Sequence, residues 1–155
     1  MAKLTLEQPS VIVDAALARG RVLALSSISV AVLDDGANLK AFKREDGPGA
    51  ALRPAIAIGK AWGAVGMGMS SRSLEKRALE RPHLVEALVA ASGGRLVPVA
   101  GGVLIRDGDG EIIGTVGVTG DTSDNDEACA VAGNEAVGLI PDWGERSPTT
   151  KEKRL

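Results

Sequence analysis

Apolar residues recur at helical spacing over residues 6–25 and then alternate with small residues from Ile28 to Val32. This change of period, from about 3.6 to 2, predicts a helix followed by a strand. An Asp-Asp-Gly turn at residues 34–36 and a further run at 39–43 complete a predicted hairpin. Thr5 and Gln8, three residues apart, are a candidate capping box in front of the first helix.

The middle of the chain reads as helical. After the helix-breaking residues 46–49, a small-residue helix is expected over 51–65, and its glycines Gly59 and Gly63 would allow close approach of another segment. Ser70 or Ser71 can cap a second helix over 74–80, and Pro82 starts a third over 83–91. Residues 95–99 are expected to form a short strand.

A second hairpin follows, with apolar runs at 103–105 and 112–118 joined by Asp-Gly-Asp-Gly. The chain then enters a helix whose first turn carries three carboxylates. We expect these to cap the helix and stabilise the positive end of its dipole. After this helix Pro141 closes the fold. The three carboxylates are those of Asp124, Asp126 and Glu127.

This order of elements predicts an α+β fold, α-β-β-α-α-α-β-β-β-α, because short hairpins imply antiparallel pairing. A length of 155 residues is most simply one domain. We place that domain at residues 1–145 and expect the polar tail, 146–155, to be poorly ordered.

Composition narrows the function classes. A net charge of −2 argues against a nucleic-acid partner, and one Cys excludes an internal disulfide and a cysteine-based metal cluster. No apolar run approaches the ~20 residues of a membrane span, and residues 1–10 lack the apolar core of a signal peptide. These features predict a cytoplasmic protein with no membrane partner. Aromatic residues are 2%, with no Tyr, so the core must be aliphatic.

Several segments carry a family resemblance. GGVLIRDGDGEIIGTVGVTG (101–120) followed by SDNDEACAVAG (123–133) resembles the C-terminal signature of the GlcG/HbpS-like, or haem-degrading, family. SVAVLDDGANLKAFKREDG (29–47) and KAWGA (60–64) are similar to earlier family segments, so the resemblance covers roughly residues 4–139. It implies a profilin-like sheet of about five strands with helices around it, and homo-oligomers. It also implies a haem or related tetrapyrrole ligand.

Lys60 lies in the segment that matches the family. Its ammonium could bind a carboxylate or propionate, or act as a base if desolvated, whereas snorkelling at the sheet edge is the simpler role. Ser71 and Arg72 follow the same helix and could line the same pocket mouth, or merely cap and face solvent. Gly101 and Gly102 allow close approach of a backbone or a ligand, with a β-bulge as the alternative. The resemblance places this pair beside the pocket.

His83 is the single histidine and a candidate axial ligand for haem iron, although a surface histidine after a helix-starting proline is the plainer reading. Cys129 and the three methionines are the remaining candidate ligands, and all read as packing residues. Cys129 has no neighbouring His to activate it as a nucleophile. Asp126 matches the acidic position of the family signature and is a candidate proton carrier, pocket-edge residue or subunit contact.

Three functions remain open from the sequence. The first is a small-ligand-binding protein whose pocket lies between sheet and helices near Lys60, Gly101 and Gly102, with haem as the ligand that the resemblance implies. The second is a cofactor-free enzyme on a small carboxylate-bearing metabolite, in which Lys60 or Arg72 holds the anion and Asp126 or Lys60 moves protons. The third is a non-catalytic accessory or assembly subunit.

Overall fold

The structure, a computed structural model, describes residues 3–144, so the tail at 146–155 lies outside the described residues. Five helices and a five-stranded antiparallel sheet confirm the predicted α+β class. The strand order is β2-β1-β4-β3-β5. Along the chain the elements are α1 (Glu7–Val22), β1 (Ser29–Asp34), β2 (Leu39–Arg44), α2 (Arg53–Met67), α3 (Ser71–Glu80), α4 (Pro82–Ala91), β3 (Gly102–Arg106), β4 (Ile112–Thr119), α5 (Ser123–Ala136) and β5 (Ile140–Asp142).

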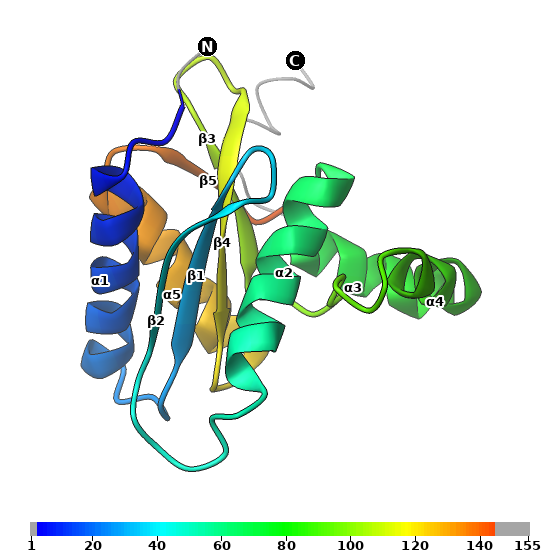
Figure 1. The fold of residues 1–155 in the computed structure, drawn as a ribbon, viewed down its shortest axis with the longest axis horizontal. Coiled ribbons are helices and arrows are strands. Elements are labelled where there is room, and N and C mark those ends of the chain that lie inside the picture. Colours follow the sequence, from blue (N-terminus) through cyan, green and yellow to red (C-terminus); the bar gives the residue numbers. More distant parts are fainter. Residues whose placement is uncertain (1–2, 145–155) are drawn as a thin grey trace.

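The sheet lies between two unequal helical layers (Figure 1). Helices α1 and α5 pack side by side on one face, and α2 covers the other. Helices α3 and α4 extend from α2 away from the sheet, forming a helical arm. The largest core lies under α1 and α5 and is aliphatic, as the composition requires; its members include Ile12, Val13, Val30, Val32, Val103, Val116 and Val118.

Helix α2 approaches the sheet closely because small residues face it. Ala31, Gly117 and Gly102 are cross-strand neighbours on β1, β4 and β3. A Cβ atom at position 117 would lie 2.0 Å from the Ala57 carbonyl oxygen, and one at 102 would lie 2.3 Å from the Lys60 carbonyl oxygen. The backbone of α2 therefore occupies the space that side chains would take, which fixes the height of Lys60 above the sheet.

One predicted strand is misplaced. Residues 95–99 are irregular, because this segment packs against α2 rather than pairing with a strand: the Val97 N–H donates to the Gly59 carbonyl at 3.3 Å. A Cβ at Gly59 would lie 2.4 Å from Val97 Cγ2, so this glycine serves packing within the chain. The fifth strand is instead β5, which contains Pro141 and pairs with β3 at the sheet edge, where a missing N–H is tolerated.

The local signals at element ends behave as predicted. The Thr5 N–H donates to Gln8 Oε1 at 3.1 Å and the Gln8 N–H donates to Thr5 Oγ1 at 3.4 Å, which is the reciprocal capping box. Ser70, rather than Ser71, caps α3 by accepting the Ser73 N–H. Within residues 3–144 no helix combines the length and apolarity needed to span a bilayer.

Candidate functional site

A buried ion pair joins the two helical layers. Lys60 on α2 and Asp126 in the first turn of α5 have side chains that are each 2% exposed, and Lys60 Nζ lies 3.3 Å from Asp126 Oδ2. The ammonium also donates to the Val118 carbonyl at 2.9 Å. The other carboxylate oxygen of Asp126 accepts the Asp121 N–H at 2.9 Å. Both charges are thus paired and hydrogen-bonded, as buried charges require.

Burial opposes ionisation of both partners. Desolvation lowers the pKa of Lys60 and raises the pKa of Asp126, while the attraction between the two charges works in the opposite direction in each case. Ionisation of this pair therefore carries a desolvation cost inside an apolar fold. A proton can be held by either partner or move between Lys60 Nζ and Asp126 Oδ2. The Lys60 ammonium already contacts two oxygens, those of Val118 and Asp126.

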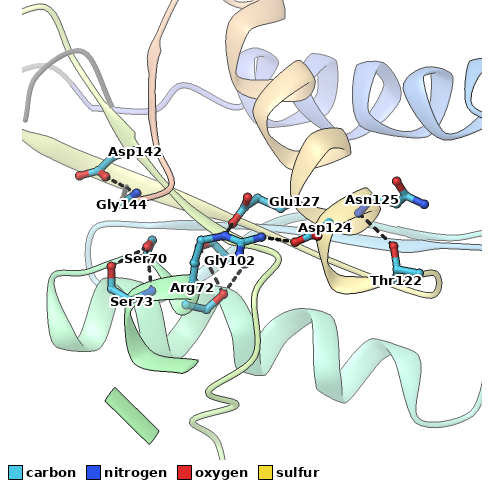
Figure 2. Close-up of polar contacts among 11 residues, drawn as sticks. Ser70, Arg72, Ser73, Gly102, Thr122, Asp124, Asn125, Glu127, Asp142 and Gly144 are labelled. Carbon is cyan, nitrogen blue, oxygen red and sulfur yellow. Dashed lines mark hydrogen bonds and ion pairs between the residues drawn. The ribbon is translucent and has the colours of Figure 1, made fainter. Parts of the chain in front are cut away.

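A second ion-pair group lies between α3 and α5 (Figure 2). Arg72 donates through Nε to Glu127 Oε2 at 2.8 Å and through Nη2 to Asp124. Glu127 is nearly buried, and desolvation raises the pKa of its carboxyl, against the effect of Arg72. Hydrogen bonds to Glu127 and Asp124 raise the pKa of Arg72, so its guanidinium stays charged. Arg72 thereby neutralises two carboxylates at the start of α5.

Ser71, Gly101 and Gly102 meet beside the buried pair. Ser71 Oγ accepts the Gly102 N–H at 2.6 Å. A Cβ at Gly101 would lie 2.9 Å from Lys60 Nζ, and Gly101 adopts a positive φ of 129°. The close approach that the two glycines allow is made by Lys60 and Ser71 themselves. The two register shifts of the sheet lie elsewhere, between Ile105 and Arg106 on β3 and between Val32 and Leu33 on β1.

The carboxylates of α5 divide their roles. Thr122 caps the helix by accepting the Asn125 N–H at 3.3 Å (Figure 2). Capping was the role expected for Asp126 and Glu127, but their partners are Lys60 and Arg72. Sequence reading alone missed this because the partners lie 66 and 55 residues away.

A groove of about 560 Å³ runs along α5. Its lining residues on α5 recur at helical spacing, which is the one sequence signal that could have marked them. Among them is Glu127, so the groove borders the Arg72 ion pairs. The lining residues are Arg19, Asp124, Glu127, Ala128, Val131, Ala132, Glu135 and Trp143.

Two further grooves, both lined mainly by apolar residues, flank α4. One, of about 310 Å³, is lined by residues of α3 and α4 and by Pro98. The other, of about 210 Å³, lies between α2 and α4 and includes Trp62, Met67 and Leu88. The Arg95 guanidinium stacks over Trp62, 4.3 Å from the ring centroid.

His83 lies apart from the ion pairs, exposed in the first turn of α4. Its neighbours Pro82 and Glu86 line the 310 Å³ groove. Cys129 is fully buried, and burial raises the pKa of its thiol to about 11, consistent with the packing role predicted for it. Within residues 3–144 no three side chains of His, Cys, Asp and Glu gather as a metal site would need.

This chain is similar to several known proteins in sequence and in fold. A search of curated proteins finds no match. Among solved structures, Streptomyces reticuli HbpS, crystallised as a double mutant, is 28% identical over 89% of this chain and 89% of its own, with a TM-score of 0.73. Another HbpS crystal structure is 27% identical over 89% and 92%, with a TM-score of 0.74. A PduOC:heme complex, 24% identical over 89% and 97% with a TM-score of 0.78, shares the fold.

The family model described as haem degrading protein HbpS-like matches residues 4–135. This match runs from Leu4, three residues before α1 begins, to the last turn of α5, and so includes both ion pairs and the helical arm. The chain therefore belongs to the HbpS-like family of haem-degrading proteins.

Proposed function

We propose that this protein binds haem, or a closely related tetrapyrrole, on helix α4, with His83 as a ligand of the iron. Family membership and the likeness to HbpS support the ligand class. The observation that carries the proposed site is the exposed imidazole of His83 next to an apolar groove on a largely apolar helix. When bound, haem supplies an iron centre whose properties its axial ligand tunes.

The donor set of the chain favours His83. Haem iron takes imidazole, thiolate, thioether or phenolate ligands, and this chain has no Tyr. Cys129 is buried, with a pKa of about 11, so it offers no accessible thiolate. Lys60 is buried with its ammonium paired. Within residues 3–144, His83 is thus the exposed strong donor, and Met67 is the thioether that reaches a groove.

The groove beside His83 has the polarity that a porphyrin ring needs. Apolar side chains dominate the lining, and Glu86 is the one charged residue among Ala78, Pro82, Val85, Glu86, Val89 and Pro98. Burying a flat apolar ring against such residues is favourable at about 25 cal/mol per Å² of apolar surface.

Two guanidinium groups are available for the propionates. Arg77, in the last turn of α3, and Arg81, between α3 and α4, are both exposed and precede His83 closely. Within the described part of the chain neither lies within 4.0 Å of a carboxylate oxygen, whereas Arg72 is fully engaged. Arginine binds carboxylates in a bidentate way, so this end of the arm suits a dicarboxylate ligand.

The pocket expected near Lys60, Ser71, Arg72, Gly101 and Gly102 stays a prediction. In the structure Lys60 and Arg72 each have carboxylate partners, and Ser71 bonds to the Gly102 backbone. A ligand anion would have to displace these contacts. For the same reason the rival enzyme function gains no support from the geometry, since neither cation is free to hold a substrate carboxylate.

The groove along α5 is the alternative ligand site. Its volume, about 560 Å³, falls in the usual range for small-molecule pockets, and Trp143 offers a ring for stacking. Among residues 3–144 its lining contains no His, Cys or Met, so these residues would offer no iron ligand to a tetrapyrrole there.

Titration of the apo-protein with hemin, followed by the Soret band, tests the proposal. We expect saturable binding that is weakened at least tenfold in His83→Ala and retained in Glu111→Ala, an exposed change in the β3–β4 turn. Trp143→Ala separates the two grooves. Binding that His83→Ala leaves intact and Trp143→Ala abolishes would move the site to α5, and no Soret shift in the wild type would overturn the proposal.

A further inference from the structure

We propose that Ser29, Thr119 and Arg53 form a binding site for a small carboxylate, at the end of the sheet where α2 begins. The site is separate from the groove beside His83, which lies on the helical arm. Three observations on residues 3–144 carry the proposal: two buried polar atoms without hydrogen-bond partners, a helix start without a side-chain cap, and a guanidinium without a carboxylate.

Two buried donors lack an acceptor. Within residues 3–144, three buried side-chain atoms have no hydrogen-bond partner, and they are Ser29 Oγ, Arg53 Nη1 and Asn134 Oδ1. Asn134 belongs to α5, and its amide nitrogen donates to the Leu104 carbonyl. The other two atoms are donors from β1 and α2. Ser29 is fully buried, so bulk water does not satisfy its hydroxyl, and native folds rarely leave such a group unpaired.

The alternation of strand side chains places Ser29 on the face that α2 covers. Ala31 pairs with Gly117, and a Cβ atom at Gly117 would lie 2.0 Å from the Ala57 carbonyl oxygen of α2. Side chains two residues apart on a strand point to the same face. Ser29 and its cross-strand partner Thr119 therefore also face α2, and their two hydroxyl groups lie on neighbouring strands beneath it.

The first turn of α2 brings Arg53 to the same place. Arg53 precedes Ala57 by one helical turn. One turn back along α2 leads toward the end of the sheet where β1 begins and β4 ends (Figure 1). The chain also leaves the sheet at this level, because Ser29 pairs with Arg44, the last residue of β2. Arg53 as a whole is half-buried, so the site borders the surface.

The charges at this end favour an anion. Helix α2 has no side-chain cap and no acidic residue in its first turn, whereas α5 has both. The first N–H groups of α2 therefore keep the partial positive charge of the helix dipole. In the described part of the chain Arg53 forms no ion pair. The carboxylates of Glu45 and Asp121, at the same end, accept backbone N–H groups of residues 28 and 26 instead.

This set of donors matches a single carboxylate. A guanidinium binds a carboxylate through paired, charge-assisted hydrogen bonds, and a hydroxyl can donate to a remaining lone pair of the same group. A dianionic phosphate would bring a second negative charge close to Glu45 and Asp121 without a second free cation to balance it. A neutral ligand would leave the charge of Arg53 unpaired. The ligand class is therefore a small monocarboxylate.

Thermal unfolding in sodium acetate, compared with sodium chloride at equal ionic strength, tests the proposal. A ligand that binds only the folded state raises the unfolding midpoint. We expect acetate to raise the wild-type midpoint in a saturable way. Arg53→Met should weaken the apparent affinity about tenfold or more and Ser29→Ala about threefold, because the first loses a charged hydrogen bond and the second a neutral one. Lys76→Met, which removes an exposed cation of α3, is the matched control and should respond like the wild type.

The midpoints in chloride alone distinguish binding from a structural role. Ser29 Oγ has no partner to lose within residues 3–144, so Ser29→Ala should leave this midpoint unchanged or raise it. A lower midpoint in chloride with an unchanged response to acetate would overturn the proposal. Arg53→Lys keeps the charge but not the planar fork, so its affinity should lie between those of the wild type and Arg53→Met, and it replaces the latter if that variant does not fold. A midpoint that rises with phosphate but not with acetate, or with neither, would also overturn the carboxylate site.

Discussion

Lys60 and Asp126, 66 residues apart in the chain, meet at 3.3 Å where α2 and α5 converge on the end of β4. Gly101 and Gly102 admit the lysine, and the Val118 carbonyl shares its ammonium. The pair ties the helix on one face of the sheet to a helix on the other. Because both side chains are buried, leaving either charge without its partner would destabilise the fold far more than burying the pair does.

Removal of one partner should therefore destabilise the fold more than removal of both. We expect Lys60→Met to lower the free energy of unfolding by about 3–5 kcal/mol, because it leaves the Asp126 carboxylate buried and uncompensated. Lys60→Met combined with Asp126→Asn should recover much of that loss. Urea denaturation of the two single variants and the double variant at pH 7 measures the coupling. Additive losses would show that the two groups do not interact.

The close docking of α2 predicts a sharp contrast between two glycines. Gly117→Ala places a Cβ 2.0 Å from the Ala57 carbonyl oxygen, so α2 must move off the sheet. We expect a loss of about 3 kcal/mol or more, at the upper end of overpacking effects. Gly108→Ala is the matched control, because a Cβ there meets nothing within 4 Å, and its effect should stay within about 0.5 kcal/mol. Thermal unfolding midpoints compare them, and equal midpoints would contradict the docking.

Loss of Arg72 should lower the free energy of unfolding more than its partial exposure suggests. Arg72→Ala leaves Glu127, which is nearly buried, without its cation, and we expect a loss of about 1–3 kcal/mol, typical of an unsatisfied charged group. Asp124→Ala removes only the exposed carboxylate, which is 82% exposed, and should cost less than about 1 kcal/mol. Urea denaturation ranks the two. A larger loss for Asp124→Ala would reverse the assignment of the buried partner.

Acid sensitivity below pH 4 should depend on Asp121. Hydrogen bonds from Asn125, Thr122 and Ser26 lower the pKa of its carboxyl from 3.8 to about 2. A carboxyl with a depressed folded-state pKa contributes stability that is fully present above its unfolded pKa and is lost as the pH falls through the folded value. The urea midpoint should therefore drop between about pH 4 and pH 2.

Asp121→Asn should flatten that drop, because asparagine does not titrate, and should leave the pH dependence of the midpoint above pH 5 unchanged, because Asp121 is ionised there in both the folded and the unfolded state. Glu127 affects stability with the opposite sign, because its pKa is raised in the folded protein. Its effect begins above pH 4.5, outside the window of Asp121. Urea midpoints measured from pH 6 to pH 2.5 in the wild type and in Asp121→Asn separate the two effects. Parallel curves for the two proteins would refute the role of Asp121.

The cysteine gives a simple check of core packing. Cys129 is fully buried, and burial raises the pKa of its thiol to about 11. At pH 8 the folded protein should therefore react with a thiol-specific reagent at least a hundredfold more slowly than the urea-unfolded protein. Comparable rates in the two states would show that α5 opens readily from the core.

Features set by neighbouring residues could be predicted from the sequence alone. The Thr5–Gln8 box, the Ser70 cap and the Asp107 turn, whose carboxylate accepts the Asp109 and Glu111 N–H groups, all join atoms within four residues of each other. Changes in the spacing of apolar residues predicted the helices and the two hairpins for the same reason, because alternation and helical spacing are properties of short stretches of sequence.

Tertiary structure alone decided the rest. The three residues of β5 carry no periodic signal, and they form a strand because the edge of β3 is open to pairing. Residues 95–99 do not form a strand because the Val97 N–H donates to the Gly59 carbonyl of α2 instead. The carboxylates of α5 looked like caps until the fold brought Lys60 and Arg72 to them. Backbone and charged groups must find partners when buried, and which partners are within reach depends on how distant segments pack.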